Sequence, residues 1–430
     1  MTASPSAKPQ AADDRARTRL LRISSRNCRN LQLSKMKLVI VHNSYQQPGG
    51  EDVAFAGECR LLEQHGHTVV PYHRSNDEIE SMSMVQRLVM PTQMISSDRS
   101  KREIRDLLRK EKPDLVHVHN TFMMVSPSIY QTCQEMGVPV LQTLHNFRLL
   151  CPAWTLSREG RVCEECVDHG LWRSVWHGCY RDSRLMTAGV ALMLQVHRGR
   201  GTWTESVDGY VALSEFARQK FVDNGLPASK FNVKPNFVQQ DPGERDAPGH
   251  YALFAGRLSP EKGVSTLLEA WQKLKHSIPL VIVGDGPLRQ SLESEAATRG
   301  LSSVKFRGWL TGEDTRTAMK RAAFLVIPSL WYEGFPMIIA ESFACGTPVV
   351  CSRLGALQEI VEDQHTGIHF SHGDADDLAS KVEWACSNRS QVCAMGKAAR
   401  QEYENRYTAE RNYTLLMQIY ERTMSAHARN

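Results

Sequence analysis

The sequence lacks an apolar run long enough to cross a membrane. The longest candidate, Leu185–Val196, is too short and is interrupted by Thr, Gly and Gln residues. The N-terminus is polar and rich in arginine, and it lacks the apolar segment of a secretory signal. The eleven cysteines, an odd number, are therefore expected to be mostly free thiols in a reducing compartment. We expect a cytoplasmic protein, with peripheral attachment to the inner face of the cytoplasmic membrane left open.

The sequence also carries little excess charge. The net charge is +5, and residues 1–36 hold eight Lys or Arg against two Asp, so the remainder is nearly neutral. Residues 1–36 are predicted to form a disordered basic arm, either simply solvated or weakly attached to anionic lipid. The basic residues are not interleaved with aromatic residues, and they form no nucleic-acid-binding motif. Nucleic acid is therefore not an expected partner.

Short apolar runs alternate with loops and helical patterns in both halves of the chain, which predicts parallel sheets covered by helices, an α/β fold. At 430 residues the chain can form two domains. A segment rich in Pro, Gly and charge, from Asn232 to Gly249, is the expected hinge. The expected strands are residues 37–41, 68–72, 114–119, 138–144 and 207–213, then 251–255, 280–283, 304–306, 323–328, 347–351 and 367–370. One charged helical segment is expected over residues 78–110.

The stretch Ser329–Pro348 follows a buried strand and predicts a phosphate-binding turn. A loop carries Glu333, and Pro336 opens a short helix where a missing N–H has no cost. The backbone N–H groups at the start of this helix would lie at its positive end, which favours phosphate. Gly346 is expected to end the helix.

Two cations leave a single glycine-rich loop on the same side of the predicted sheet as Glu333. Arg257 and Lys262 lie five residues apart in this loop. Surface Lys and Arg are usually just solvated, but two cations beside a glycine loop and a helix N-terminus favour a doubly charged pyrophosphate.

Three histidines follow or end predicted strands of the first half. In open parallel sheets ligands bind beyond the carboxyl ends of the strands, so His42, His119 and His145 would face one crevice. A single histidine in such a place is more often structural, whereas three in register suggest that at least one is functional.

Four cysteines fall within 29 residues: Cys151, Cys163, Cys166 and Cys179. Four thiolates could close a structural zinc site that leaves no open position for catalysis. A disulfide or redox pair and unligated thiols are the alternatives.

Two further patterns each have two interpretations. Residues 181–200 predict a helix with a wide apolar face and basic ends, either a core helix or a membrane-surface contact. Asp374 and Asp376 form an acid-x-acid pair of the kind that can hold a metal ion. They also fall at a predicted helix start, where Asp is an ordinary cap, and we favour the cap.

Motifs of the second half, in combination, resemble the retaining glycosyltransferases of family 4. The first half agrees more loosely, through Pro48–Glu51, Gly66-His67 and the strand that ends in His145. The run from His145 to Pro152, with the later cysteines, is similar to a subset of bacterial polysaccharide-assembly transferases. The second-half motifs are Gly256-Arg257 with Pro260–Gly263, Val283–Pro287, Glu333–Pro336 with Glu341, and Cys345–Pro348.

The resemblance implies a GT-B fold, with two Rossmann-like domains that face each other across a cleft. The implied domains are residues 37–235 for the acceptor, with a Cys-rich insertion at 151–180, and 236–408 for the nucleotide-sugar. A helix near residues 409–430 is expected to pack back on the first domain.

The resemblance also implies roles for individual residues. Arg257 and Lys262 would bind the diphosphate and stabilise the leaving group without a metal. Glu333 would hold sugar hydroxyls, Glu341 the ribose diol, and His145 would contact the sugar near the reacting carbon. The remaining expected donor-binding residues are Gly49, Gly50, Gly256, Gly308, Trp309, Leu310, Gly334, Phe335, Pro336 and Met337.

The implied activity is transfer of a sugar from a nucleoside diphosphate-sugar to a polysaccharide, glycolipid or polyprenyl-linked acceptor, as in hexosyltransferases. No cofactor is expected beyond the donor itself, apart from the structural zinc. Since no first-half carboxylate stands out as a nucleophile, same-face displacement assisted by the leaving phosphate is expected. The alternatives are an enzyme that makes a small soluble glycoside and an inactive subunit that only binds nucleotide-sugar.

Overall fold

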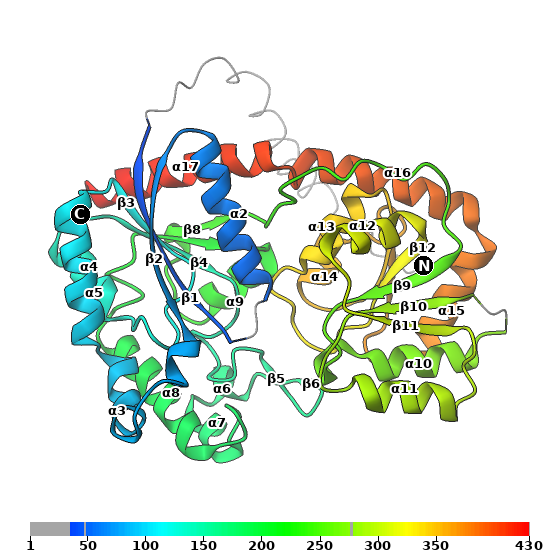
Figure 1. Cartoon of the computed structure of the whole chain (residues 1–430), viewed down its shortest axis with the longest axis horizontal. Coiled ribbons are helices and arrows are strands. Elements are labelled where there is room, and N and C mark those ends of the chain that lie inside the picture. Colours follow the sequence, from blue (N-terminus) through cyan, green and yellow to red (C-terminus); the bar gives the residue numbers. More distant parts are fainter. Residues whose placement is uncertain (1–34, 47–48, 276–277, 430) are drawn as a thin grey trace, which may run out of the picture. The chain divides into compact units, whose positions relative to one another are not determined.

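The structure is a computed structural model that describes residues 35–46, 49–275 and 278–429. The predicted arm, residues 1–36, lies almost entirely outside these residues. Residues 36–430 form one structural unit built around two parallel sheets, with helices packed around each sheet (Figure 1).

The first sheet has six parallel strands in the order β2-β1-β3-β4-β7-β8. The sequence predicted five of them. It missed β8, two of whose three half-buried residues were assigned to the hinge, because an edge strand this short leaves no apolar run. The strands are β1 (Lys37–Ser44), β2 (Thr68–Ser75), β3 (Leu115–Val118), β4 (Val140–Leu144), β7 (Gly209–Ala212) and β8 (Phe231–Val233).

The helices of the first half include two where the sequence predicted one. The expected segment 78–110 divides into α3 and α4, because the Ser97 side chain accepts a hydrogen bond from the Ser100 amide and starts a new helix. The helices are α2 (Gly50–Gln64), η1 (Asn76–Ile79), α3 (Met84–Ile95), α4 (Asp98–Glu111), α5 (Ser128–Glu135), α8 (Arg184–Gly199), α9 (Glu215–Asp223) and η2 (Ala228–Lys230).

The Cys-rich segment contains only short elements. These are β5 (Ser157–Arg158), β6 (Arg161–Val162), α6 (Glu165–Asp168) and α7 (Trp172–His177), and β5 and β6 form a small antiparallel hairpin.

The second sheet has the strand order β11-β10-β9-β12-β13-β14, all parallel, which is the order of a dinucleotide-binding Rossmann domain. Buried apolar clusters cover both of its faces. The strands are β9 (Tyr251–Ala255), β10 (Leu280–Val283), β11 (Val304–Gly308), β12 (Ala322–Ile327), β13 (Val349–Ser352) and β14 (Gly367–Phe370).

The helices of the second half follow these strands in turn. Asp374 caps α15 by accepting from the Asp376 and Asp377 amides, as predicted for an ordinary helix start. The helices are η3 (Pro260–Lys262), α10 (Val264–Lys273), α11 (Arg289–Thr298), α12 (Gly312–Arg321), α13 (Met337–Ala344), α14 (Ala356–Ile360), α15 (Ala375–Ser387), α16 (Arg389–Arg406) and α17 (Ala409–His427).

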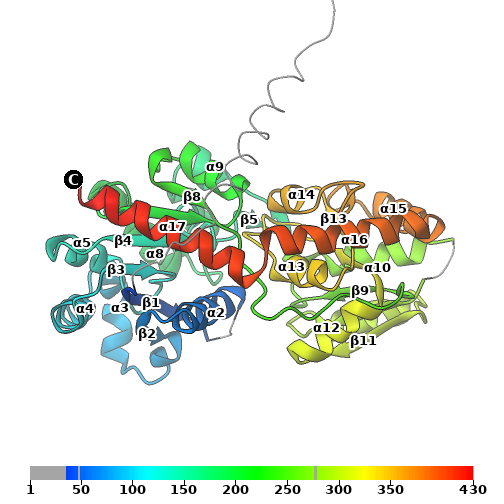
Figure 2. The same cartoon turned by 90° about the horizontal axis from the view of Figure 1, so that it is seen from above.

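The last helix, α17, returns from the second half and packs on the first sheet (Figure 2). The Tyr420 hydroxyl lies 2.9 Å from His117 Nδ1, and the Asn412 side chain bonds to Lys234. Within the described residues, no helix combines the length and the apolar character needed to span a bilayer.

Candidate active site

The loops that follow β9 and β12 form the centre of the candidate site. These two strands are neighbours, and the chain crosses to opposite sides of the sheet from them, so their carboxyl ends flank the topological switch point. Ligands of open α/β sheets bind there. The β9 loop carries Arg257 and Lys262, and the β12 loop carries Glu333. The fold therefore brings together three residues that the sequence singled out separately.

Lys262 and Glu333 form a close ion pair. The Lys262 ammonium lies 2.7 Å from Glu333 Oε1, and the Ser329 hydroxyl donates to the same oxygen over 2.7 Å. Glu333 is only 6% exposed. Burial raises its pKa, but the Lys262 charge and the Ser329 hydroxyl outweigh burial and leave the pKa below its ordinary value. The carboxylate is therefore ionised and fixed at the floor of the site.

Glycines allow the loops of the site to pack backbone against backbone. Gly263 has φ +67°, and a Cβ added to it would lie 1.9 Å from the Pro328 carbonyl oxygen. A Cβ on Gly284 would lie 1.9 Å from the Gly256 carbonyl oxygen. Because no side chain fits at either position, only glycine lets the three loops meet.

Gly334 is where the β12 loop meets the first half of the chain. A Cβ on Gly334 would lie 2.5 Å from the His145 carbonyl oxygen, which follows β4. The predicted donor loop and the predicted sugar-contacting histidine are therefore in contact, although 189 residues separate them in the sequence.

The Cys-rich segment braces the β12 loop. The Trp154 ring packs edge-on against Trp331 with 5.4 Å between centroids, and the Tyr332 hydroxyl donates to Glu164 over 2.8 Å. Glu164 in turn accepts from Lys220 of α9. Trp331 and Tyr332, which precede Glu333, are thus both held by the Cys-rich segment of the first half.

The other predicted donor residues follow strands of the second sheet and differ in how exposed they are. Arg257 is exposed in the β9 loop, and Trp309 is 73% exposed in the loop after β11. Glu341 is half-buried within α13, and burial raises its pKa while Arg316 opposes the shift. Pro336 is the N-cap of α13, so Met337 is its first residue. Gly346 follows the helix with φ +69°, as predicted for its end.

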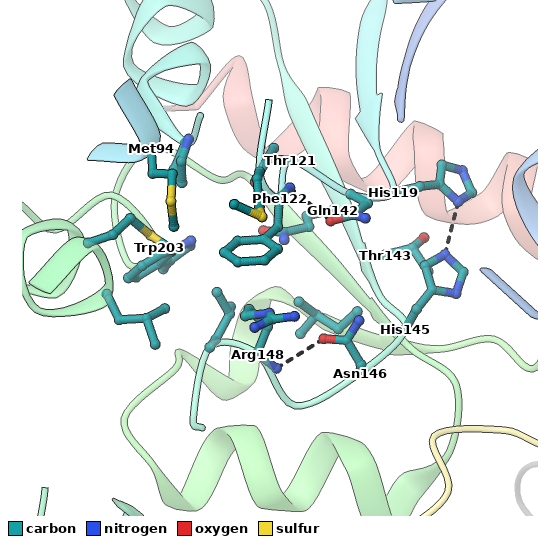
Figure 3. A pocket seen from close by; sticks show the side chains of 17 residues that line it. Met94, His119, Thr121, Phe122, Gln142, Thr143, His145, Asn146, Arg148 and Trp203 are labelled. Atoms are coloured by element: carbon teal, nitrogen blue, oxygen red, sulfur yellow. Dashed lines mark hydrogen bonds between the residues drawn. The ribbon is translucent and has the colours of Figure 1, made fainter. Parts of the chain in front are cut away.

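His145 belongs to a buried histidine chain. Its Nε2 lies 3.0 Å from His119 Nδ1 (Figure 3). On its other side, His119 Nε2 lies 3.2 Å from Glu58 Oε1. His42 does not join the chain: it lies within β1, pairs with Asp52 over 2.9 Å and stacks on Phe55. The expectation of three equivalent histidines is therefore wrong for His42, because β1 extends beyond the predicted strand and buries it.

The buried Glu58 already has a cation. Among the described residues, Glu58, His117 and His119 are the group whose ligand atoms lie within 4.8 Å of one another, as a metal site would require. However, the Lys234 ammonium lies 2.9 Å from Glu58, and only 2% of the Lys234 residue is exposed. This ammonium neutralises the carboxylate where a metal ion would otherwise be needed.

The sequence missed the carboxylate Glu51. Glu51 lies in the first turn of α2, and its oxygens accept from the side-chain amides of Asn120 (2.9 Å) and Asn146 (3.1 Å). Burial and the neighbouring Asp52 charge raise the pKa of Glu51 to about 8. Its position after the two loop glycines was a signal, but the asparagines that hold it lie 69 and 95 residues away.

A cavity of about 50 Å³ lies beside this cluster, lined in part by Asn120, Asn146 and Arg148 (Figure 3). Ligand pockets usually measure roughly 300–1,000 Å³. The cavity is therefore too small for a sugar and lies behind the candidate site.

The four cysteines are neighbours but not a closed cluster. All four are free thiols. A side-chain hydrogen bond with Cys166 lowers the pKa of Cys151 to about 6, while burial and the nearby Cys151 and Cys163 raise the pKa of Cys179 to about 11. Nevertheless, no three of the four sulfur atoms lie within 4.8 Å of one another.

Comparison with known proteins agrees with this arrangement. Residues 48–241 match the model of glycosyltransferase family 4, and residues 239–402 match that of glycosyl transferases group 1. An uncharacterized glycosyltransferase of Methanocaldococcus jannaschii is 31% identical over 293 residues, which span 66% of this chain and 68% of that protein. The match to another glycosyltransferase of that organism spans 60% of the relative's length.

Two solved structures have the same fold. Sucrose-phosphate synthase from Thermosynechococcus elongatus superposes with a TM-score of 0.69 and 18% identity, covering 91% of this chain and 100% of that one. HepE of Anabaena, in complex with UDP and glucose, superposes with a TM-score of 0.63 and 19% identity, covering 90% and 98%. These findings confirm the predicted GT-B fold, and the chain is a glycosyltransferase that belongs to family 4.

Proposed function

We propose that the protein transfers a sugar, with retention of anomeric configuration, from a nucleoside diphosphate-sugar to a polysaccharide, glycolipid or polyprenyl-linked acceptor. The observation that carries the proposal is the Lys262–Glu333 pair at the switch point, beside the contact between Gly334 and His145. We propose UDP as the donor nucleotide, because HepE was solved with UDP-glucose.

The site residues act on opposite ends of the donor in this proposal. Lys262 and the exposed Arg257 bind the diphosphate and stabilise its charge as the sugar–phosphate bond breaks, which is electrostatic catalysis without a metal. Glu333, ionised and fixed, accepts hydrogen bonds from sugar hydroxyls. Glu341 accepts from the ribose diol, and Gly308, Trp309 and Leu310 flank the base. The N-terminal end of α13 faces the phosphates.

Donor hydrolysis by the purified protein tests the proposal. Lys262→Ala and Glu333→Gln should each lower turnover of the preferred nucleotide-sugar by about 100-fold or more. Lys273→Ala is the matched control, because Lys273 is exposed on α10 and pairs only with surface acids. Wild-type turnover in both site variants would overturn the assignment.

The acceptor class separates the leading proposal from its alternatives. Transfer to lipid-linked or polymeric glycans supports it, whereas transfer only to soluble sugars supports an enzyme that makes small glycosides. Nucleotide-sugar binding without turnover of any donor would indicate an inactive binding subunit.

We also propose that α3, α7 and α8 form a membrane-docking face. These helices pack side by side (Figure 1). Trp172, Trp176 and Leu185 are 57%, 65% and 85% exposed, and the Arg173 and Arg184 guanidinium groups lie over the two tryptophan rings. Exposed tryptophan beside arginine suits the interface of an anionic bilayer.

Vesicle sedimentation tests the docking face. The double variant Trp172→Ala/Trp176→Ala should lose binding to phosphatidylglycerol vesicles, while Trp309→Ala, an exposed tryptophan of the other half, should keep it. Equal binding by all three proteins would contradict the docking face.

We propose a structural zinc ion for the four cysteines, since each thiol acts electrostatically on at least one other. Because no three of the sulfur atoms lie within 4.8 Å of one another, zinc binding would have to draw them closer together. Zinc would cross-link the Cys-rich segment, which contacts Trp331 and Tyr332. The expected result is one zinc per chain by elemental analysis, and a folded, active, zinc-free protein would contradict it.

A further inference from the structure

The first sheet has its own switch point, and a carboxylate lies there. In the order β2-β1-β3, strand β2 lies on one side of β1 and strand β3 on the other, so the chain reverses direction across the sheet at β1. Glu51 lies in the first turn of α2, the helix after β1, and Asn120 follows β3. In α/β sheets this is where ligands bind. Glu51 therefore lies at the switch point of the first sheet, as the predicted donor loops lie at the switch point of the second sheet.

Two neutral amides hold this carboxylate in one orientation. Asn120 Nδ2 donates to Glu51 Oε1 over 2.9 Å and also to the Asn43 carbonyl over 2.7 Å. Asn146 Nδ2 donates to Glu51 Oε2 over 3.1 Å, while its own Oδ1 accepts from the Arg148 amide over 3.0 Å (Figure 3). A carboxylate offers about four lone-pair directions. These amides orient Glu51 and leave acceptor capacity for a hydroxyl group.

The hydrogen bonds fix the carboxylate without neutralising it. The Arg148 guanidinium is engaged elsewhere, with Nη1 on the Pro152 carbonyl and its plane over the Phe122 ring at 3.9 Å. The groups that act on Glu51 are Asp52 on the same helix, Arg148 and Asn146 from the β4 loop, and the Tyr45 hydroxyl from the β1 loop. Burial and Asp52 together outweigh the others and raise the pKa of Glu51 to about 8.

Glu51 is not needed as a helix cap. The Asp52 side chain accepts from the Gly49 amide over 2.7 Å and pairs with His42, so Asp52 already fixes the start of α2. A half-buried acid with a raised pKa, no ion-pair partner among the described residues and no capping role is a candidate for proton transfer.

Glu51 is also linked through Asn146 to the loop that would hold the donor sugar. Asn146, which holds it, is the residue after His145, and the His145 carbonyl oxygen touches the donor loop at Gly334. The path from Glu51 to Gly334 thus consists of the hydrogen bond to Asn146, the peptide unit between Asn146 and His145, and the contact of that carbonyl with Gly334.

We propose that Glu51 binds the attacking hydroxyl of the acceptor and receives its proton, an inference that rests on the glycosyltransferase function proposed above. The hydroxyl oxygen forms a bond to the anomeric carbon, and the bond from that carbon to the diphosphate oxygen breaks. The electron pair leaves with the nucleoside diphosphate. The proton passes to the Glu51 carboxylate and from there to solvent. The ligand class is therefore an alcohol, a glycan hydroxyl group.

Hydrolysis of the donor, with water in the place of the acceptor, tests this role without knowledge of the acceptor. A base must be unprotonated, so the wild-type rate should rise with pH and level off above about pH 8. Glu51→Gln should lower the rate on the order of 100-fold and remove the inflection. UDP binding measured by calorimetry should be unchanged, because the carboxylate contacts the acceptor side. Glu63→Gln, an exposed acid on the same helix, is the matched control.

A second variant separates a chemical role from a structural one. Glu51→Ala removes the carboxylate and leaves space, so added formate should restore part of the hydrolysis rate in this variant and not in Lys262→Ala. A Glu51→Gln protein with the wild-type rate or the wild-type pH inflection would overturn the inference alone. A wild-type protein that neither binds nor hydrolyses any nucleotide-sugar would overturn the proposed function and this inference with it.

Discussion

His119 Nδ1 and His145 Nε2 lie 3.0 Å apart and share one hydrogen bond, so only one of these nitrogens carries a proton. The other nitrogen of His119 faces the buried Glu58. Burial raises the pKa of Glu58, but the Lys234 charge together with the His117 and His119 side chains outweighs burial and leaves the pKa well below its ordinary value. The ionised Glu58 therefore favours a proton on His119 Nε2. Since burial lowers the pKa of His119 to about 4, its Nδ1 is bare and accepts from His145.

The tautomer of His145 follows from this chain. We predict that His145 carries its proton on Nε2 and offers a bare Nδ1, which can accept a hydrogen bond from a sugar hydroxyl but cannot donate one. Correlation spectra of protein labelled with ¹⁵N-histidine distinguish the two tautomers, and the His145→Asn variant assigns the signal.

Two variants of His119 test whether its hydrogen bond sets the tautomer of His145. The Asn side chain places an acceptor near the Nδ1 position, whereas the longer Gln side chain places a donor near Nε2. We expect His119→Asn to preserve the His145 tautomer and His119→Gln to change it. The same tautomer in both variants would mean that the hydrogen bond from His145 to His119 does not control it.

The lowered pKa of His119 also predicts a pH dependence of stability. The unfolded chain binds a proton near the ordinary histidine pKa, and the folded chain does so only near pH 4. The free energy of unfolding should therefore fall as the pH decreases from about 6.5 towards 4, by at most about 3 kcal/mol from this residue. Urea denaturation at several pH values should show a smaller loss in His119→Asn than in the wild type.

The buried Lys234–Glu58 pair should behave as a unit. Removing one partner leaves an uncompensated buried charge, so Lys234→Met or Glu58→Gln should each cost about 3–5 kcal/mol of unfolding free energy. Lys234 also bonds to Asn412 of α17, so the loss should loosen that helix. The double variant should cost less than the sum of the single changes, and an additive result in denaturant titrations would contradict the coupling.

Gly334 is predicted to control the contact between the donor loop and the first half. In Gly334→Ala the new Cβ would clash with the His145 carbonyl oxygen at 2.5 Å, so the loop must move. Turnover should fall by about 10-fold or more, because small misplacements of reacting groups have large effects on rate. The control is Gly199→Ala, since a Cβ there meets nothing within 4 Å. Equal kcat values for the two variants would show that the contact is unimportant.

The sequence by itself determined the elements and the motifs of the second half. Strands β9 and β10 begin and end where their apolar runs do, and Gly346 ends α13, because these are local effects of burial and backbone freedom. The motifs around Lys262 and Glu333 were recognisable for the same reason: each lies within one strand–loop–helix unit.

Only the tertiary structure decided the chemistry of the first half. Glu58, His119 and Lys234 lie far apart in the sequence, and so do Glu51 and Asn146, so no local pattern shows which of them meet. The strand β8 is too short to be evident without its partner β7. A pKa and a tautomer depend on burial and on neighbours across the fold, and these exist only once the sheet and α17 have packed together.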